Sequence, residues 1–96
     1  MSRAVPEPCA SLLEETVVLP GGAQITIALW RERVRGLRYR LCFVRGAACL
    51  VRYDNETPGR ARRQLRGRTL PYEVRSVEQL RYDFERDVEA VHGAQP

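Results

Sequence analysis

Alternation of apolar and polar residues with a period of two restricts the fold of this chain more than any other feature. It is most regular over residues 23–30, where the apolar positions of one face are Ile25, Ile27 and Leu29. Such alternation is typical of a β-strand with one buried face. Pro20-Gly21-Gly22 separates this run from the apolar residues 16–19, and glycine adopts the positive φ angles that a tight turn requires. We therefore predict a hairpin of residues 16–19 and 23–30.

A second alternating region predicts another hairpin, with strands over residues 39–45 and 48–53. Arg45-Gly46 lies where its turn should fall, and the connection from the first hairpin, residues 31–38, is polar. Asp54-Asn55 should end the strand, because both residues favour turns and can bond their own backbone. Further along, Tyr72 and Val74 are expected to form a short fifth strand.

The C-terminal segment has helical rather than strand periodicity, and we predict a helix over residues 76–91. Its apolar stripe consists of Val77, Leu80, Phe84, Val88 and Val91. Ser76 followed by Gln79 is a capping-box pattern, and Gly93 lies where a helix C-cap belongs. The stripe should bury Leu80 and Phe84 against the sheet. The predicted fold is α+β: an antiparallel β-meander of four to five strands with one C-terminal α-helix packed on the sheet.

The chain of 96 residues is long enough for one domain with one core. Residues 1–11, with Pro6 and Pro8 and no periodicity, are expected to be a flexible lead-in, and residues 12–93 a single domain. No apolar run approaches the ~20 residues of a membrane span, and the first residues lack the apolar core of a secretion signal. We therefore expect a cytoplasmic protein without membrane contact.

Residues suited to metals, cofactors or proton transfer are few. Cys9, Cys42 and Cys49 lack C-x-x-C spacing, so we expect no disulfide and no zinc site, and we expect Cys42 and Cys49 to be small buried hydrophobes. The single histidine, His92, is expected to be exposed at the end of the helix. No glycine-rich loop has phosphate-binding spacing. We expect no metal and no cofactor.

Positive charge is concentrated in one segment. All sixteen basic residues are arginine, a bias that a GC-rich coding sequence also produces, and the net charge is +4. Nine residues without an acid contain Arg60, Arg62, Arg63, Arg66 and Arg68. Acids gather in the predicted helix, at Glu78, Asp83, Glu85, Asp87 and Glu89. The molecule should have a basic side that contacts a polyanion and an acidic side.

An ordered series of motifs resembles the TumE family of small toxin–antitoxin proteins. The series is Tyr53-Asp54-Asn55, the basic run, Pro71-Tyr72-Glu73-Val74, and the helix that begins Ser76-Val77-Glu78-Gln79-Leu80. The corresponding family motifs are Tyr-Asp-Asn, Gly-Asp-His-Arg-His, Pro-Tyr-x-Phe and Ser-Val-Glu-x-Leu-x-x-Asp-Phe-x-x-Asp-Val. They align without gaps over residues 53–88.

The resemblance implies a toxin that cleaves RNA and is balanced by a helix-turn-helix antitoxin. Two histidines could serve as general base and general acid while an arginine stabilises the phosphorane. Here the family's histidines fall on Arg62 and Gln64, its aspartate falls on Ala61, and only the arginine persists, as Arg63. Arginine has a pKa above ~12 and glutamine does not titrate, so neither moves protons at neutral pH.

The leading interpretation is a TumE-like toxin–antitoxin component that binds RNA and has impaired or lost endoribonuclease activity. Its expected RNA-binding residues are Arg60, Arg62, Arg63, Gln64, Arg66 and Arg68. One alternative is a non-catalytic interaction module that docks an acidic protein partner. The other is an active ribonuclease with a rearranged site of Tyr53, Asp54, Glu56 and Arg63. Expected partners are RNA and a helix-turn-helix antitoxin, and a homodimer is left open.

Overall fold

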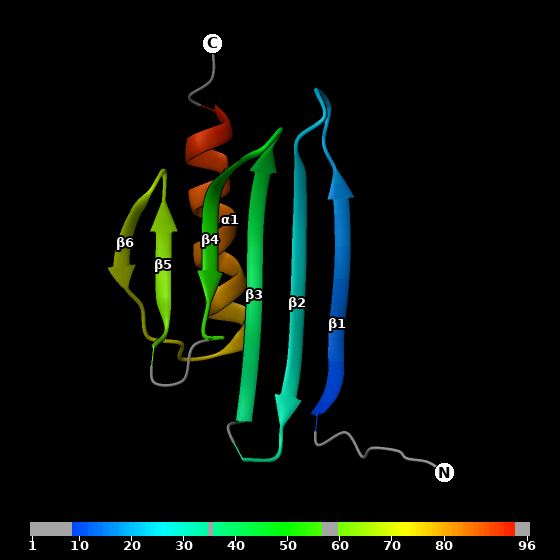
Figure 1. Cartoon of the computed structure of the whole chain (residues 1–96), viewed down its shortest axis with the longest axis vertical. Helices are drawn as coiled ribbons and strands as arrows, with labels where there is room; N and C mark the ends of the chain where they lie inside the picture. Colours follow the sequence, from blue (N-terminus) through cyan, green and yellow to red (C-terminus); the bar gives the residue numbers. More distant parts are fainter. Residues whose placement is uncertain (1–8, 35, 57–59, 94–96) are drawn as a thin grey trace.

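One antiparallel sheet and one helix make up the fold. The structure, a computed structural model, describes residues 9–34, 36–56 and 60–93. Within these ranges the elements are β1 (Cys9–Val18), β2 (Gln24–Glu32), β3 (Gly36–Arg45), β4 (Ala48–Asp54), β5 (Arg62–Leu65), β6 (Arg68–Pro71) and α1 (Val77–Gly93). The strands pair in sequence order, and α1 lies on one face of the sheet (Figure 1). The predicted α+β meander with a C-terminal helix is confirmed.

The predicted number of four to five strands is wrong, because the basic run itself forms the β5–β6 hairpin. Tyr72 and Val74, expected as the fifth strand, lie outside any strand. Leu65 pairs with Arg68 across a two-residue turn, Arg66-Gly67, whose φ angles are 47° and 87°. Two positive φ angles give a turn whose twist matches that of a hairpin. These arginine-rich strands lack alternating apolar residues, so they cannot be predicted from hydrophobic periodicity.

The first hairpin is confirmed but extends further than predicted. The Gly21-Gly22 turn has φ angles of 90° and 93°, and Leu19 N donates to Ala23 O at 2.7 Å. β1 begins at Cys9 rather than residue 16, because the chain before Leu13 continues to pair with β2 past a register shift. Residues 9–11 of the expected lead-in are therefore strand, and residues 1–8 lie outside the described residues. The polar connection is likewise shorter than predicted, since β2 continues to Glu32 and β3 starts at Gly36.

The core lies between the sheet and α1. Buried sheet residues include Ile27, Leu29, Tyr39, Leu41, Phe43, Val51 and Tyr53, and buried helix residues are Leu80, Phe84, Val88 and Val91. Phe84 is completely buried and meets the ring of Tyr53 edge-on, with centroids 5.8 Å apart, so the predicted burial of Phe84 and Leu80 is confirmed. Ser76 Oγ accepts a hydrogen bond from Gln79 N at 3.0 Å, as expected of an N-cap.

The cysteines differ from the prediction in one respect. Cys42 is buried, and burial raises the pKa of its thiol, but Cys49 is exposed. The expectation of two buried cysteines is wrong because a register shift after Phe43 interrupts regular pairing with β4, where Cys49 lies near the start. Both are free thiols. Among the described residues, no helix is long and apolar enough to cross a membrane.

Candidate functional site

The Tyr53-Asp54-Asn55 motif at the end of β4 directs three side chains to three places. The Tyr53 hydroxyl donates to Asp87 of α1, so Tyr53 points to the helix-covered face. Asp54 points to the opposite, open face, since neighbouring strand residues alternate. Asn55 bridges to β3: its Oδ1 accepts from Tyr39 N at 2.9 Å, and its Nδ2 donates to Leu37 O at 2.9 Å. The motif therefore links β4 to α1 through Tyr53 and to β3 through Asn55, and it places the Asp54 carboxylate on the open face.

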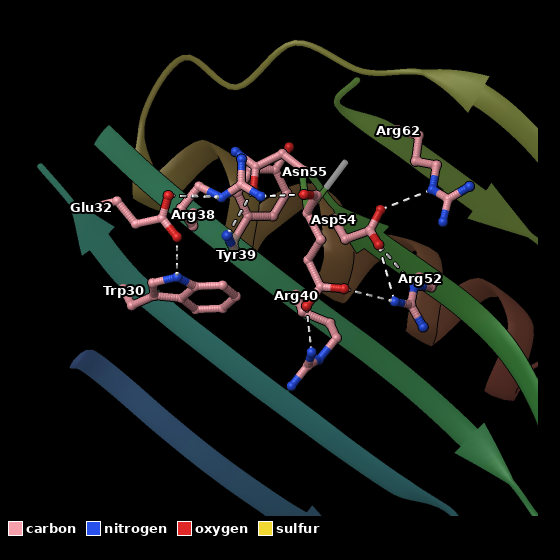
Figure 2. Close-up of polar contacts among 10 residues, drawn as sticks. Trp30, Glu32, Arg38, Tyr39, Arg40, Arg52, Asp54, Asn55 and Arg62 are labelled. Atoms are coloured by element: carbon pink, nitrogen blue, oxygen red, sulfur yellow. Dashed lines mark hydrogen bonds and ion pairs between the residues drawn. The ribbon is translucent and has the colours of Figure 1, made fainter. Parts of the chain in front are cut away.

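Asp54 lies at the centre of a polar cluster on the open face. Although this residue is only 2% exposed, its carboxylate accepts from Arg62 Nε at 2.9 Å and from Arg52 Nε at 3.1 Å (Figure 2). Strand register explains the arrangement, because Asp54 pairs with Arg62, and Arg52 pairs with Gln64. Two guanidinium groups thus neutralise a buried carboxylate, which would be costly to bury alone.

Glu56 extends this cluster toward β3. Its Oε1 accepts from Arg52 Nη2 at 3.3 Å, its Oε2 accepts from Arg40 Nη1, and its main-chain oxygen accepts from Arg38 Nη2. We define the open-face cluster as Arg38, Arg40, Arg52, Asp54, Glu56, Arg62 and Gln64. Arg38 is buried, whereas the side chains of Arg40 and Arg62 are 46% and 41% exposed. The last two can therefore still contact an anion from solvent.

A second polar cluster lies on the helix side. Arg63 donates two hydrogen bonds to Asp87, from Nε to Oδ2 at 2.7 Å and from Nη2 to Oδ1 at 2.9 Å. The hydrogen bonds to Asp87 raise the pKa of Arg63, so its charge is permanent. Burial, followed by the bond to Asp87, raises the pKa of Tyr53 well above its ordinary value. Tyr53 and Arg63 are thus held as a protonated donor and a fixed cation beside one carboxylate.

The structure separates the residues of the rearranged catalytic site. Tyr53 and Arg63 lie on the helix side, whereas the side chains of Asp54 and Glu56 join the open-face cluster. The sheet stands between the two pairs, so these four side chains do not converge on one substrate atom.

The predicted RNA-binding run is divided as well. Arg62 and Gln64 face the open side, Arg63 faces α1, and Arg60 is exposed just before β5. Arg66 and Arg68 are exposed at the turn, at the other end of the short hairpin. Their distribution follows directly from strand alternation and the hairpin turn.

Sequence reasoning missed Arg38, Arg40 and Arg52 as members of the site. The signal was present, since Arg38 and Arg40 recur with period two and β3 register places Arg40 opposite Asp54. His92 is exposed, as predicted, and its Nδ1 lies 3.2 Å from Arg45 Nη2, near the β3–β4 turn and at the opposite end of the sheet from Arg62. In the part of the chain that the structure describes, no group of three or more potential ligands could hold a metal.

A six-stranded antiparallel meander with one covering helix and a polar open face defines a small α+β protein. A family model described as Toxin TumE matches residues 12–92, which is most of the chain. The chain therefore belongs to the TumE toxin family, and the resemblance in its motifs is confirmed. It is accordingly a toxin–antitoxin component, for which the family suggests an antitoxin partner. No curated protein and no solved structure matches it.

Proposed function

We propose that this chain binds RNA through the open-face cluster and lacks the acid–base pair that RNA cleavage requires. The observation that carries the proposal is the placement of Arg62 and Gln64 side by side on the open face, next to Asp54 and Arg52. Alternate residues of a strand lie about 7 Å apart, close enough to act on two sides of one phosphodiester. The family resemblance places two histidines at these positions, but the groups present do not titrate at neutral pH.

RNA binding is supported by the unused N–H donors of the cluster's guanidinium groups. Arg40, Arg52 and Arg62 each have N–H groups besides those that bond Asp54 and Glu56, because a guanidinium carries five donors. The paired carboxylates hold the guanidinium groups in fixed positions. Such a preorganised arrangement suits contacts to successive phosphates of a strand lying across the sheet.

The rearranged ribonuclease is disfavoured by the same geometry. The Glu56 carboxylate accepts from Arg40 and Arg52, and the buried Asp54 carboxylate accepts from Arg52 and Arg62. Tyr53 is a protonated donor on the far side of the sheet. None of the three is a free base that faces the arginine of the proposed set, Arg63.

Binding to short single-stranded RNA, followed by fluorescence anisotropy, tests the proposal. If Arg40, Arg52 and Arg62 each neutralise one phosphate, the log–log salt slope should be about −2, from roughly −0.7 per contact. Replacing both Arg40→Gln and Arg62→Gln should reduce the slope by about 1.4 and weaken binding to all sequences similarly.

The matched control is Arg75→Gln with Arg81→Gln, which removes the same charge outside the open-face cluster and should leave the slope nearly unchanged. Binding that ignores salt, or equal losses in both double variants, would contradict an RNA site on the open face. Absence of RNA binding at low salt would instead favour an acidic protein partner. Two further proposals concern the partners: an antitoxin of the helix-turn-helix type, which the resemblance implies, and a homodimer of the chain.

A further inference from the structure

A polar cavity lies on the helix side, apart from the open-face cluster. Its volume is about 320 Å³, and it is lined by Tyr53, Arg63, Tyr72, Asp83, Arg86 and Asp87. This volume falls at the lower end of the ~300–1,000 Å³ of small-molecule sites. Tyr72 follows directly after β6, the edge strand, so the cavity lies near the rim of the sheet.

In one part of the cavity wall, the hydrogen-bonding groups are already paired with one another. Asp87 accepts two hydrogen bonds from Arg63 and one from the buried Tyr53 hydroxyl, so its charge is neutralised and its acceptor sites are largely occupied. This part of the wall is a rigid, electrically neutral surface. It shapes the cavity rather than attracting a charged ligand.

Asp83 and Arg86 form the other part of the wall, and both retain unused hydrogen-bonding capacity. Asp83 Oδ2 accepts from the Tyr72 hydroxyl at 2.6 Å and Oδ1 from Gln79 Nε2 at 2.9 Å, which leaves about one acceptor site on each oxygen. Arg86 lies with its guanidinium 5.8 Å from the Tyr82 ring centre and takes part in no ion pair among the described residues. Positions three apart on a helix are neighbours, with Cβ atoms about 5–6 Å apart.

A ligand that fits must present two adjacent donors to Asp83 and an acceptor edge to Arg86. It should also be flat, because the half-buried Tyr72 ring lines the same cavity and planar bases pack on aromatic rings. Guanine meets these requirements: the N2 amino group and N1–H are two adjacent donors on its Watson–Crick edge, and O6 follows them there as an acceptor. N7 lies beyond O6 on the adjoining edge, and O6 and N7 are the usual arginine acceptors. Uracil offers one donor between two acceptors, and adenine and cytosine offer one amino group beside an acceptor.

We propose that this cavity is a guanine-binding site, with Asp83 reading N1–H and N2–H and Arg86 reading O6 or N7. The base belongs either to an RNA strand or to a free guanine nucleotide. Naming RNA as its source rests on the proposed RNA-binding function, whereas recognition of the base does not.

The first experiment titrates GMP, AMP, CMP and UMP into the protein and follows backbone amide shifts by NMR. We expect GMP to bind at least about tenfold more tightly than the other three nucleotides. It should also shift the amide resonances of residues around the cavity. Asp83→Asn turns one acceptor toward guanine into a donor, and Arg86→Gln removes the cation. Each should weaken GMP binding by about 10- to 100-fold. Arg81→Gln, on the same helix but outside the cavity, should leave it unchanged.

Thermal melts confirm that each variant is folded before it is compared. Equal binding of the four nucleotides, or GMP binding that Asp83→Asn and Arg86→Gln leave intact, would overturn the proposal. The second variant keeps it testable if Asp83→Asn fails to fold, because Arg86 contributes to no described ion pair.

The second experiment identifies the source of the base. It compares a short oligouridine with the same strand carrying one guanine, by fluorescence anisotropy. If RNA supplies the base, the guanine strand binds more tightly, GMP competes for that gain, and Asp83→Asn abolishes it. GMP binding without any preference for the guanine strand would overturn the RNA source and assign the site to a free nucleotide. Loss of RNA binding in the Arg40→Gln, Arg62→Gln variant with GMP binding intact would separate this site from the open face.

Discussion

Introducing two histidines at the positions of Arg62 and Gln64 should create weak RNA cleavage. In strand β5 both side chains face the open side, so the two imidazoles would lie about 7 Å apart beside the same bound strand. The neighbours differ in charge. Asp54, which now pairs with Arg62, would stabilise an imidazolium at position 62, whereas Arg52, which pairs with Gln64 across the ladder, would disfavour one at position 64. Position 62 should therefore supply the general acid and position 64 the general base.

The size of the effect follows from these roles. Positioned acid–base catalysis contributes about 10²–10⁴-fold, and neither imidazole is effective without the other. We expect Arg62→His with Gln64→His to raise metal-independent cleavage of a single-stranded RNA by about 10²-fold, toward the lower end of that range, because removing Arg62 also removes a phosphate contact. Each single variant should stay near background. Asp54 should raise the pKa of the imidazole at position 62 above ~6.5, and Arg52 should lower the pKa of the imidazole at position 64 below it. The rate should therefore follow a bell-shaped pH profile.

Cleavage of a doubly labelled oligonucleotide in the presence of a chelator measures this rate. The control is Arg75→His with Arg81→His, which adds the same number of imidazoles outside the open-face cluster. Adding Ala61→Asp tests whether a second carboxylate improves orientation beyond Asp54. Robust cleavage by the unchanged chain, lost in Glu56→Gln or Tyr53→Phe but untouched by changes at 62 and 64, would refute the reasoning. So would equal activity in the control.

Three further predictions concern stability, each measured by urea or thermal unfolding. Phe84→Ala should destabilise the fold by about 3–5 kcal/mol, because a completely buried ring and its edge contact are lost. A loss below 1 kcal/mol would contradict a core centred on this ring. Asp87→Asn should cost about 3 kcal/mol by unpairing Arg63, near the low end for a buried pair since that arginine is 32% exposed; Glu89→Gln, exposed on the same helix, is its control and should be nearly neutral. Burial, then the Asp54 charge, raises the pKa of Tyr39 to about 12 from 10.0. The contribution of this shift to the free energy of unfolding is therefore complete below pH 10 and is lost as the pH rises to about 12. Tyr39→Phe should weaken this alkaline decline and be neutral or slightly stabilising at pH 7, since the Tyr39 hydroxyl has no hydrogen-bond partner among the described residues.

The elements with strong hydrophobic periodicity were predictable from the sequence. The apolar periods of two in β2 and of about 3.6 in α1 appear in the chain. β3 has the same alternation in Tyr39, Leu41 and Phe43, although it also buries Arg38 and Cys42 on its other face. β5 and β6 were not predictable in this way, because Arg62 and Arg63 on the two faces of this hairpin bond the carboxylates of Asp54 and Asp87 rather than packing in an apolar core. The turn at Arg66-Gly67 was the usable signal: a glycine after a polar residue between two short runs favours a tight hairpin.

The site was predictable as a set of residues but not as an arrangement. Consecutive positions 62, 63 and 64 appear in the sequence as one basic stretch, yet a strand sends its middle residue to the face opposite its neighbours. Recognising β5 would have been enough to separate Arg63 from Arg62. Its pairing with Asp87 depends in addition on how α1 is rotated over the sheet, which Phe84, one turn earlier, fixes by burying its ring against Tyr53.

The separation of Arg63 from Arg62 gives the two faces of the sheet different roles. Arg63 and Asp87 neutralise one another and tie β5 to the helix, so the arginine that persists from the family pattern is held by the protein itself rather than offered to solvent. A role for Arg63 in stabilising a phosphorane on the open face would require it to cross the sheet. Chemistry at positions 62 and 64 must therefore draw its positive charge from the other arginines of the open-face cluster. In the histidine variant Arg62 is lost, and Arg52, which pairs with position 64 across the ladder and is anchored by Asp54, is the remaining arginine placed to stabilise the transition state. Arg52→Gln in that background should consequently abolish the gained cleavage, whereas Arg63→Gln should lower stability and leave the remaining folded protein active.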